Sequence, residues 1–182
     1  MNIIETGIEG LLIIEPKVFE DSRGYFFESY NRDKWNELDI NQDFVQDNQS
    51  KSSYGVVRGL HYQLAPHAQS KMVRVLYGEV LDVAVDLRKD SPTFKQSFSI
   101  FLSDQNKRQL LIPKGFAHGF AVLSEEAVFY YKCDELYNTS AERGILYNDT
   151  SLDIDWMIPE KKRIISDKDM ILPEFDKAEM NF

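Results

Sequence analysis

The stretch Lys71-Met72-Val73-Arg74-Val75-Leu76-Tyr77-Gly78-Glu79-Val80-Leu81-Asp82-Val83-Ala84-Val85-Asp86-Leu87 decides the fold class of this chain of 182 residues. Residues 81–87 alternate apolar side chains with mostly polar ones, which is the period of a half-buried β-strand. Residues 71–77 form a second strand candidate, and Gly78 and Glu79 separate the two as a turn signal. The stretch therefore predicts two strands joined as a hairpin.

Outward from this stretch, the chain continues as strand after strand. The further strand candidates are residues 11–15, 25–30, 55–63, 96–102, 109–112, 119–123 and 128–133. Helical signals are fewer: a short helix over 31–38 with Asn31 as N-cap, one turn over 103–108, and a last helix that begins near Ser166 or Asp167. We expect an all-β antiparallel sandwich or barrel of the jelly-roll type with a few short peripheral helices. Residues 1–182 contain no internal repeat or linker and are expected to form a single domain.

The composition narrows the classes of function. A net charge of -9 argues against non-specific nucleic-acid binding, which needs a basic face, but it allows a phosphorylated small molecule held by a few focused cations. No apolar run is long enough to span a membrane, and the first residues lack the pattern of a signal peptide. Cys133 is the only cysteine, so no internal disulfide can form. These features favour a cytoplasmic protein without a membrane or nucleic-acid partner.

Several runs occur together in a specific order. They are Asp21-Ser22-Arg23-Gly24-Tyr25-Phe26-Phe27-Glu28, residues 46–50, Gly55 to Gln63, Gly78 to Arg88, Ile112-Pro113-Lys114-Gly115-Phe116-Ala117-His118-Gly119-Phe120, Tyr131-Lys132 and Asn148-Asp149. In this order the chain resembles the dTDP-4-dehydrorhamnose 3,5-epimerase family over nearly its whole length. The resemblance implies a cupin-like β jelly roll, a homodimer, and neither a metal nor an organic cofactor.

Epimerisation of a 4-keto sugar sets clear chemical demands on the site. The hydrogens at C3 and C5 are acidified by the ketone, but a base must still remove them and a positive charge must stabilise the enolate oxygen. An acid must then return a proton from the opposite face. By its residue type, His61 can be this base or a hydrogen-bonded structural histidine. The resemblance implies the base, oriented by a C-terminal aspartate, for which Asp169 is preferred and Asp167 is the alternative.

The resemblance assigns the acid and the cation to two strand residues. Tyr131 matches the family's acid, and a phenol with a pKa of about 10 stays protonated at neutral pH. Without the resemblance, Tyr131 and Tyr130 would simply be core aromatic residues of a strand. Lys71 is the candidate cation for the enolate oxygen, because an ammonium pointing into a barrel is otherwise costly. A solvated strand end is the alternative for Lys71.

His118 raises the question of a metal. It lies in a segment that resembles the second conserved segment of cupins, where a histidine binds metal together with a His-x-His pair. The earlier segment here is His61-Tyr62-Gln63, so the second histidine is missing. Two imidazoles without a clear carboxylate make a poor metal site. We expect no metal, and we expect His118 to line the substrate site, oriented by Asp82, with a buried structural histidine as the alternative.

The diphosphate of a sugar nucleotide needs cationic side chains, and the arginine fork suits phosphate oxygens. By the resemblance, Arg23 and Arg58 contact the phosphates. The positions that match the family's nucleotide contacts are Phe26, Glu28, Gln46 and Asn48. The resemblance further suggests that Phe26 and Glu28 reach the site from the partner subunit. Taken alone, each of these residues could be an ordinary turn or surface residue.

One local difficulty concerns Arg58 and His61. In a regular strand, side chains three residues apart point to opposite faces, so these two could not share one pocket. Gly59 lies between them, and a glycine inside a strand often marks a bulge. We therefore predict irregular strand pairing at Gly59.

The sequence thus favours inversion of C3 and C5 of dTDP-4-dehydro-6-deoxy-D-glucose, which gives dTDP-4-dehydro-L-rhamnose. His61 takes the protons, Lys71 stabilises the enolate and Tyr131 returns a proton. The alternatives are a single-centre epimerase acting on a related nucleotide sugar, a non-catalytic sugar-nucleotide binding module, and a metal-dependent cupin. The absent His-x-His pair makes the last of these the weakest.

Overall fold

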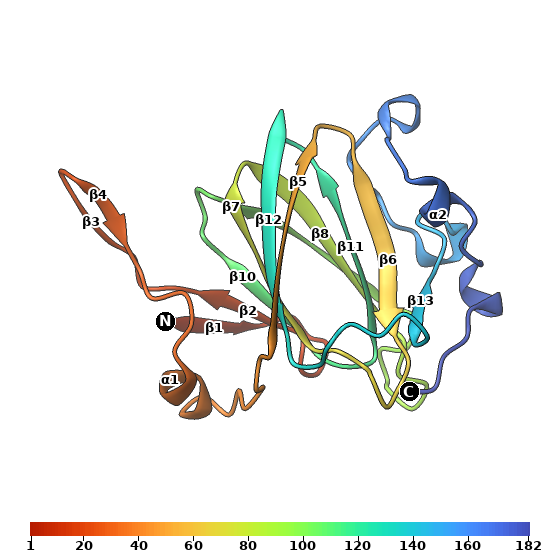
Figure 1. The fold of residues 1–182 in the computed structure, drawn as a ribbon, viewed down its shortest axis with the longest axis horizontal. Helices are drawn as coiled ribbons and strands as arrows, with labels where there is room; N and C mark the ends of the chain where they lie inside the picture. Colours follow the sequence, from red (N-terminus) through yellow and green to blue (C-terminus); the bar gives the residue numbers. More distant parts are fainter.

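A computed structural model describes residues 1–182 as two antiparallel β-sheets packed face to face (Figure 1). The six-stranded sheet has the order β1 (Asn2–Glu5), β2 (Leu12–Glu15), β10 (Gln109–Ile112), β7 (Lys71–Tyr77), β12 (Glu126–Cys133) and β5 (Gln46–Ser53). The five-stranded sheet has the order β13 (Glu142–Gly144), β6 (Val57–Gln63), β11 (Phe116–Val122), β8 (Glu79–Asp86) and β9 (Ser97–Ser103). This architecture confirms the predicted all-β jelly roll.

The remaining elements lie around the two sheets. Strands β3 (Phe19–Asp21) and β4 (Gly24–Phe26) form a separate hairpin, here called the arm, which projects from the body (Figure 1). The helices are α1 (Arg32–Asn36) and α2 (Asp167–Met170), with the 3-10 turns η1 (Thr150–Leu152), η2 (Glu160–Lys162) and η3 (Phe175–Lys177). The predicted N-cap of α1 is confirmed, since Asn31 Oδ1 accepts from the Lys34 backbone N–H at 3.2 Å. Helix α2 begins where the sequence predicts, with Ser166 as its N-cap.

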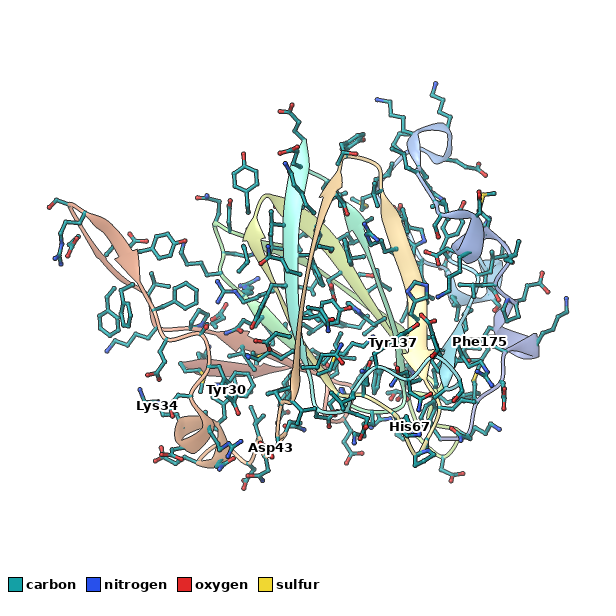
Figure 2. All side chains as sticks on the ribbon, viewed as in Figure 1. Tyr30, Lys34, Asp43, His67, Tyr137 and Phe175 are labelled. Carbon is teal, nitrogen blue, oxygen red and sulfur yellow. The ribbon has the colours of Figure 1, made fainter.

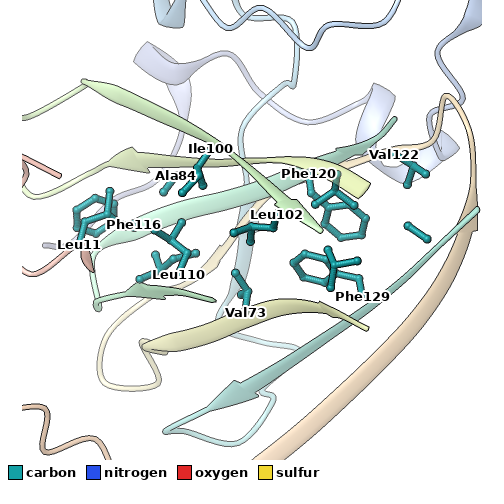
Figure 3. Packing of buried hydrophobic residues seen from close by; sticks show 14 of the residues in the cluster. Leu11, Val73, Ala84, Ile100, Leu102, Leu110, Phe116, Phe120, Val122 and Phe129 are labelled. Atoms are coloured by element: carbon teal, nitrogen blue, oxygen red, sulfur yellow. The ribbon is translucent and has the colours of Figure 1, made fainter. Parts of the chain in front are cut away.

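The main core lies between the sheets. Figure 3 shows apolar side chains of β7, β10 and β12 facing those of β8, β9 and β11. The fully buried members include Val73, Leu102, Leu110 and Val122. Burial of these side chains from both sheets supplies the main driving force that holds the sheets together. The interior of the sandwich therefore offers a rigid frame in which a cavity can be placed.

The predicted hairpin of residues 71–87 is wrong. Strand β7 pairs with β10 and β12, whereas β8 pairs with β11 and β9, so the two consecutive strands belong to different sheets. Gly78, with φ +80°, turns the chain from one sheet to the other. A Cβ atom there would come within 2.1 Å of the Glu126 carbonyl oxygen, so only glycine fits this corner. A turn signal marks the end of a strand but does not determine the strand's partner.

The alternation in residues 81–87 is real, but its two faces are both buried. Leu81, Val83 and Val85 pack outward against the C-terminal segment, in a cluster with Trp156 and other apolar residues. The polar position Asp82 points into the sandwich and is fully buried. The strand is therefore not half-buried, because the C-terminal segment covers the outer face of the five-stranded sheet, beside β6 in Figure 1. No helix of the structure has the length and apolarity needed to cross a lipid bilayer.

Other strand predictions differ mainly in their limits. The candidate over 25–30 is strand only up to Phe26, and β11 begins at Phe116, three residues earlier than predicted. Residues 104–106 form a turn between β9 and β10. The sequence did not predict β1, β3, β5 and β13 as strands. Of these, β5 matters most, because it lines the site.

Candidate active site

A cavity of about 630 Å³ lies between the two sheets, on the side where β5 and β6 run. Its lining comes from five strands and from the segment that leads into α2. The lining residues are Asn48, Gln49, Ser50, Val56, Val57, Arg58, His61, Lys71, His118, Gly119, Phe120, Phe129, Tyr131, Ile164, Ile165, Ser166, Lys168 and Asp169. The cavity therefore brings together all four candidate catalytic residues and three of the seven candidate substrate-binding residues.

The predicted irregularity at Gly59 is confirmed. In the pairing of β6 with β11, His61 lies opposite His118 but Arg58 lies opposite Phe120, so three steps along β6 match two along β11. The extra residue shifts the alternation, and both Arg58 and His61 line the cavity. Gly59 has φ +116°, and a Cβ atom there would come within 2.6 Å of the Gly119 Cα atom. The bulge needs glycine at this point.

His61 forms a hydrogen-bonded pair with Asp169. Nε2 of His61 lies 2.7 Å from Oδ1 of Asp169, whose other oxygen accepts from the Gly59 backbone N–H at 3.3 Å. Burial alone would raise the pKa of Asp169, but the hydrogen bond and charge interaction with His61, together with hydrogen bonds from Gly59 and Ser166, lower that pKa. The carboxylate is thus ionised and accepts from Nε2, which leaves Nδ1 as the nitrogen available to take a proton. Asp167, the alternative partner, is exposed.

Tyr131 and Lys71 enter the cavity from the six-stranded sheet, opposite His61. Burial raises the pKa of Tyr131, so its phenol stays protonated well above neutral pH. Lys71 Nζ lies 5.9 Å from the centre of the Tyr131 ring. Burial lowers the pKa of Lys71, although the nearby groups Cys133 and Asp82 partly oppose this effect. Lys71 forms no ion pair within the chain, so its charge is available to an anion in the cavity.

His118 is held by Asp82 from behind, as predicted. Its Nε2 lies 2.9 and 3.1 Å from the two carboxylate oxygens of Asp82, and the imidazole is only 8% exposed. The ring lies near that of Phe129, with centroids 6.0 Å apart. His118 lines the cavity at a fixed orientation because of these contacts. No group of three or more His, Cys, Asp or Glu side chains comes together in a metal-binding arrangement.

Arg58 lies at the cavity mouth and is oriented by a serine that the sequence did not single out. Its Nε donates to Ser52 Oγ at 3.1 Å, which leaves both terminal nitrogens free to meet an anion. Ser52 is buried on β5, on the same face as Asn48. Gln46 does not line the cavity, but its amide donates to Asn48 Oδ1 at 3.0 Å and its Oε1 accepts from the Tyr137 backbone at 2.9 Å.

The structure does not bring Arg23, Phe26 and Glu28 to the cavity of their own chain. Arg23 and Phe26 are on the arm. The side chain of Arg23 is 87% exposed and forms an ion pair with Asp21 beside it, and Phe26 is 69% exposed. Glu28 forms an ion pair with Lys34 of α1 at 2.8 Å. Figure 2 shows Lys34 at the base of the arm, on the other side of the molecule from His67. The predicted nucleotide contacts of these three residues stay predictions.

Several residues that line or support the cavity were not predicted from the sequence. Ser50 and Ser52 lie on a strand with a uniformly polar sequence, so no hydrophobic alternation reveals them. Phe120 and Phe129 line the cavity with their rings stacked at 4.1 Å between centroids. Lys168 adds a third cation and pairs with Glu142 at 2.7 Å. Ser52 could have been found only by extending the strand alternation from Gln46 and Asn48, which places residues 46, 48, 50 and 52 on one face.

The cavity combines an oriented histidine, a protonated phenol and buried or focused cations. A base on one wall and an acid on the opposite wall, with a cation beside the acid, are the groups that a proton-transferring carbohydrate epimerase needs. The site and the jelly roll together define a cupin-like epimerase of sugar substrates.

Comparisons with known proteins specify this class. The family model described as dTDP-4-dehydrorhamnose 3,5-epimerase matches residues 5–177. A protein of Shigella flexneri with that name is 54% identical over 180 residues, covering 98% of each chain. The chain belongs to the dTDP-4-dehydrorhamnose 3,5-epimerase family.

Solved structures agree with this assignment. The dTDP-4-dehydrorhamnose 3,5-epimerase from Elizabethkingia anophelis, known from a crystal structure, is 55% identical in sequence to this chain. The two structures superpose with a TM-score of 0.94, and the match covers 98% of this chain and 99% of the other. A dTDP-6-deoxy-D-glucose-3,5-epimerase from Legionella pneumophila, solved in complex with dTDP-4-keto-L-rhamnose, is 51% identical with a TM-score of 0.92. The match between the two proteins covers 97% of this chain and 93% of the Legionella pneumophila chain.

Proposed function

We propose that this chain inverts C3 and C5 of dTDP-4-dehydro-6-deoxy-D-glucose, giving dTDP-4-dehydro-L-rhamnose, with His61 as the base and Tyr131 as the acid. The observation that carries the assignment is their placement: His61 is on β6 of one sheet and Tyr131 on β12 of the other. Inversion requires removal of a proton from one face of the carbon and its return to the other. A base and an acid on facing sheets meet this requirement.

In each half of the reaction, His61 Nδ1 takes the proton from the carbon next to the ketone, and the electron pair moves onto the ketone oxygen. Asp169 holds the ring and stabilises the imidazolium that forms. The ammonium of Lys71 stabilises the enolate oxygen because both lie in a buried site, where their attraction is strong. Tyr131 then donates its phenolic proton to the carbon from the opposite face, and the electron pair returns from the oxygen. Before the second half, the imidazolium releases its proton to water and the Tyr131 phenolate takes one from water, which restores both groups.

The diphosphate is assigned to the mouth of the cavity. Arg58 directs its guanidinium there and has no carboxylate partner within the chain, while Ser52 fixes its orientation. Asn48 supplies polar atoms from β5 beside it, and Gln46 orients Asn48. His118 lines the sugar end of the same cavity, held by Asp82.

A homodimer accounts for the arm. Phe19, Tyr25 and Phe26 expose more than half of their surface on a two-stranded hairpin whose strands pair only with each other. Exposed aromatic clusters of this kind mark interaction sites. The arm of one subunit would place Arg23, Phe26 and the nearby Glu28 against the nucleotide in the partner's cavity. The dTDP-sugar and a second copy of the chain are the only partners proposed, in a cytoplasmic, cofactor-independent enzyme formed by one domain.

Incubation with dTDP-4-dehydro-6-deoxy-D-glucose in D2O, read by proton NMR, tests the function. The expected result is loss of the C3 and C5 proton signals by deuterium incorporation, together with the coupling constants of the L-rhamno product. Exchange at one carbon alone would establish a single-centre epimerase instead. Binding of dTDP without any exchange would identify a binding module.

A further inference from the structure

Phe120 and Phe129 form an aromatic stack between the two sheets. Phe120 is on β11 and Phe129 on β12, and their ring centroids are 4.1 Å apart with an interplanar angle of 14° (Figure 3). They are only 5% and 1% exposed, yet both line the cavity. They are therefore among its most buried lining residues, and along β11 Phe120 lies opposite Arg58 of β6, two positions beyond the pair of His118 and His61.

The stack lies next to side chains of the proposed chemistry on both sheets. His118 is two residues before Phe120 on β11, and Tyr131 is two residues after Phe129 on β12, so strand alternation points each pair to the same side. The Phe129 ring centre lies 6.0 Å from that of His118 and 6.1 Å from that of Tyr131. An apolar surface thus borders the group that returns the proton.

The two reacting carbons of the sugar differ in what they carry. C3 has a hydroxyl group, whereas C5 has a methyl group, which is the only wholly apolar substituent of the sugar ring. The groups of the proposed chemistry are polar: the His61–Asp169 pair, Lys71 and His118. The other apolar lining residues, Val56, Val57, Ile164 and Ile165, come from the start of β6 and from the segment before α2. A methyl group gains by leaving water for an apolar surface, and a hydroxyl group loses if it finds no partner there.

We propose that the Phe120–Phe129 stack is the binding surface for the methyl group on C5, and that it selects 6-deoxy sugars over 6-hydroxy sugars. The proposal rests on the proposed function. The stack holds C5 against Tyr131 through its methyl group, so it contributes to proton transfer at C5 and not at C3. Phe120 and Phe129 are in this sense specificity-determining residues for one of the two steps.

The test compares exchange at the two carbons within one substrate. Deuterium uptake at C3 and C5 is followed by NMR for the wild type, Phe120→Leu and Phe129→Leu, with the natural substrate and with an analogue that has hydrogen in place of the C5 methyl group. We expect the C5-to-C3 rate ratio for the natural substrate to fall about fourfold in each variant, the factor that corresponds to burial of one methyl group. For the analogue the ratio stays within about twofold of the wild type, because no methyl contact exists to lose.

A matched control is Phe98→Leu, which removes the same atoms from a phenylalanine that packs on the same core but does not line the cavity. It should leave the ratio unchanged. Equal losses at both carbons, or the same ratio change with both substrates, would overturn the proposal by showing a purely structural role. If wild-type protein exchanges neither carbon, the proposed function itself has failed.

Selection against a 6-hydroxyl group has its own measurement. The wild type is given the 4-keto analogue that has a hydroxymethyl group on C5, and the C5-to-C3 ratio is expected to drop about tenfold or more, the scale on which pockets discriminate single small groups. An unchanged ratio would refute the proposed selection against 6-hydroxy sugars. The methyl contact itself is decided separately, by Phe120→Leu and Phe129→Leu.

Discussion

The cavity and the arm carry candidate site residues in opposite structural settings. His61, Lys71 and Tyr131 lie on strands with hydrogen-bonded neighbours on both sides, inside a packed sandwich. Every residue of β3 and β4 is exposed, and the arm pairs only with itself. Proton transfer needs groups whose positions are fixed to fractions of an ångström. The cavity of a single chain contains all the candidate groups for this step. Under the proposed function, nucleotide binding would be divided between two subunits, because Arg23, Phe26 and Glu28 lie outside the cavity of their own chain.

The largest effect should follow the loss of the base. In His61→Asn, deuterium uptake at C3 and C5 should fall about 10³-fold or more, since general-base catalysis alone contributes on this scale. The affinity for dTDP should change less than about twofold, because Arg58 and β5 are untouched. Isothermal titration supplies the affinity and NMR the exchange. If exchange persists in this variant, His61 is not the base, and the cavity does not hold the complete set of proton-transfer groups.

Removal of the acid should separate two observables. In Tyr131→Phe, inversion should fall about 10²-fold, because no group returns a proton from the far face. Exchange should fall less than inversion, since His61 can still remove a proton and return a deuteron to the same face. Product analysis and deuterium uptake from the same samples give both rates. Equal falls in the two rates would assign Tyr131 a structural role only.

The arm can be tested by mixing chains. Phe26→Ala should raise KM for the nucleotide sugar about tenfold through the loss of a buried ring contact, with a smaller change in kcat. When Phe26→Ala and His61→Asn chains are unfolded and refolded together, half of the dimers are mixed. In each mixed dimer, one cavity has its own His61 and an intact arm from its partner.

Such a mixture should regain about a quarter of the wild-type sites at equal proportions. The two variants refolded separately and then combined without subunit exchange serve as the control. Activity no greater than the average of the two parents would show that the arm does not serve the partner's cavity, and the division between the two regions would disappear.

A smaller effect is expected at the mouth of the cavity. Ser52→Ala removes the acceptor that orients Arg58, and KM should rise about threefold to fivefold, the value of one hydrogen bond, while kcat changes little. Ser52→Thr keeps the hydroxyl group and should restore KM. A fall in kcat in both variants would instead indicate a disturbed β5.

The smallest effect concerns pH. Burial lowers the pKa of Lys71, so as pH rises its ammonium is lost earlier than that of an exposed lysine, while burial raises the pKa of Tyr131 and keeps its phenol protonated. The alkaline limb of the kcat profile should therefore lie below the ordinary lysine pKa of about 10.4. In Lys71→Arg, the guanidinium stays charged and the limb should move to higher pH, at a reduced rate. A limb that does not move would show that Lys71 is not the titrating group.

What the sequence could predict depends on how local the signal is. The N-cap of α1, the start of α2 and most strand positions follow from short patterns. The bulge at Gly59 was predictable because two functional residues of one strand demanded it. The pairing of His61 with Asp169, 108 positions apart, came only from the family resemblance, and no spacing rule could choose it over Asp167.

Two failures have clear physical causes. The inner face of β5 is polar because it lines a cavity, so the usual apolar signal of a buried strand is missing there. The supposed hairpin failed because each of β7 and β8 finds its neighbours in a different sheet, a property of long-range pairing that the Gly78 turn does not encode. The stack of Phe120 on Phe129 is likewise a contact between sheets, visible only after the fold is known.

The bulge in β6 has a consequence for the gene that encodes this chain. Because one surplus residue sets which side chains of the strand face the cavity, an in-frame deletion of the Gly59 codon would restore regular alternation across β6 and β11. With Arg58 kept in place, His61 would then stand two positions away and still face the cavity opposite His118, but the Gly59 N–H that donates to Asp169 Oδ2 would be gone. Loss of three nucleotides would thus keep both side chains in the cavity and remove a backbone donor that holds the aspartate behind His61.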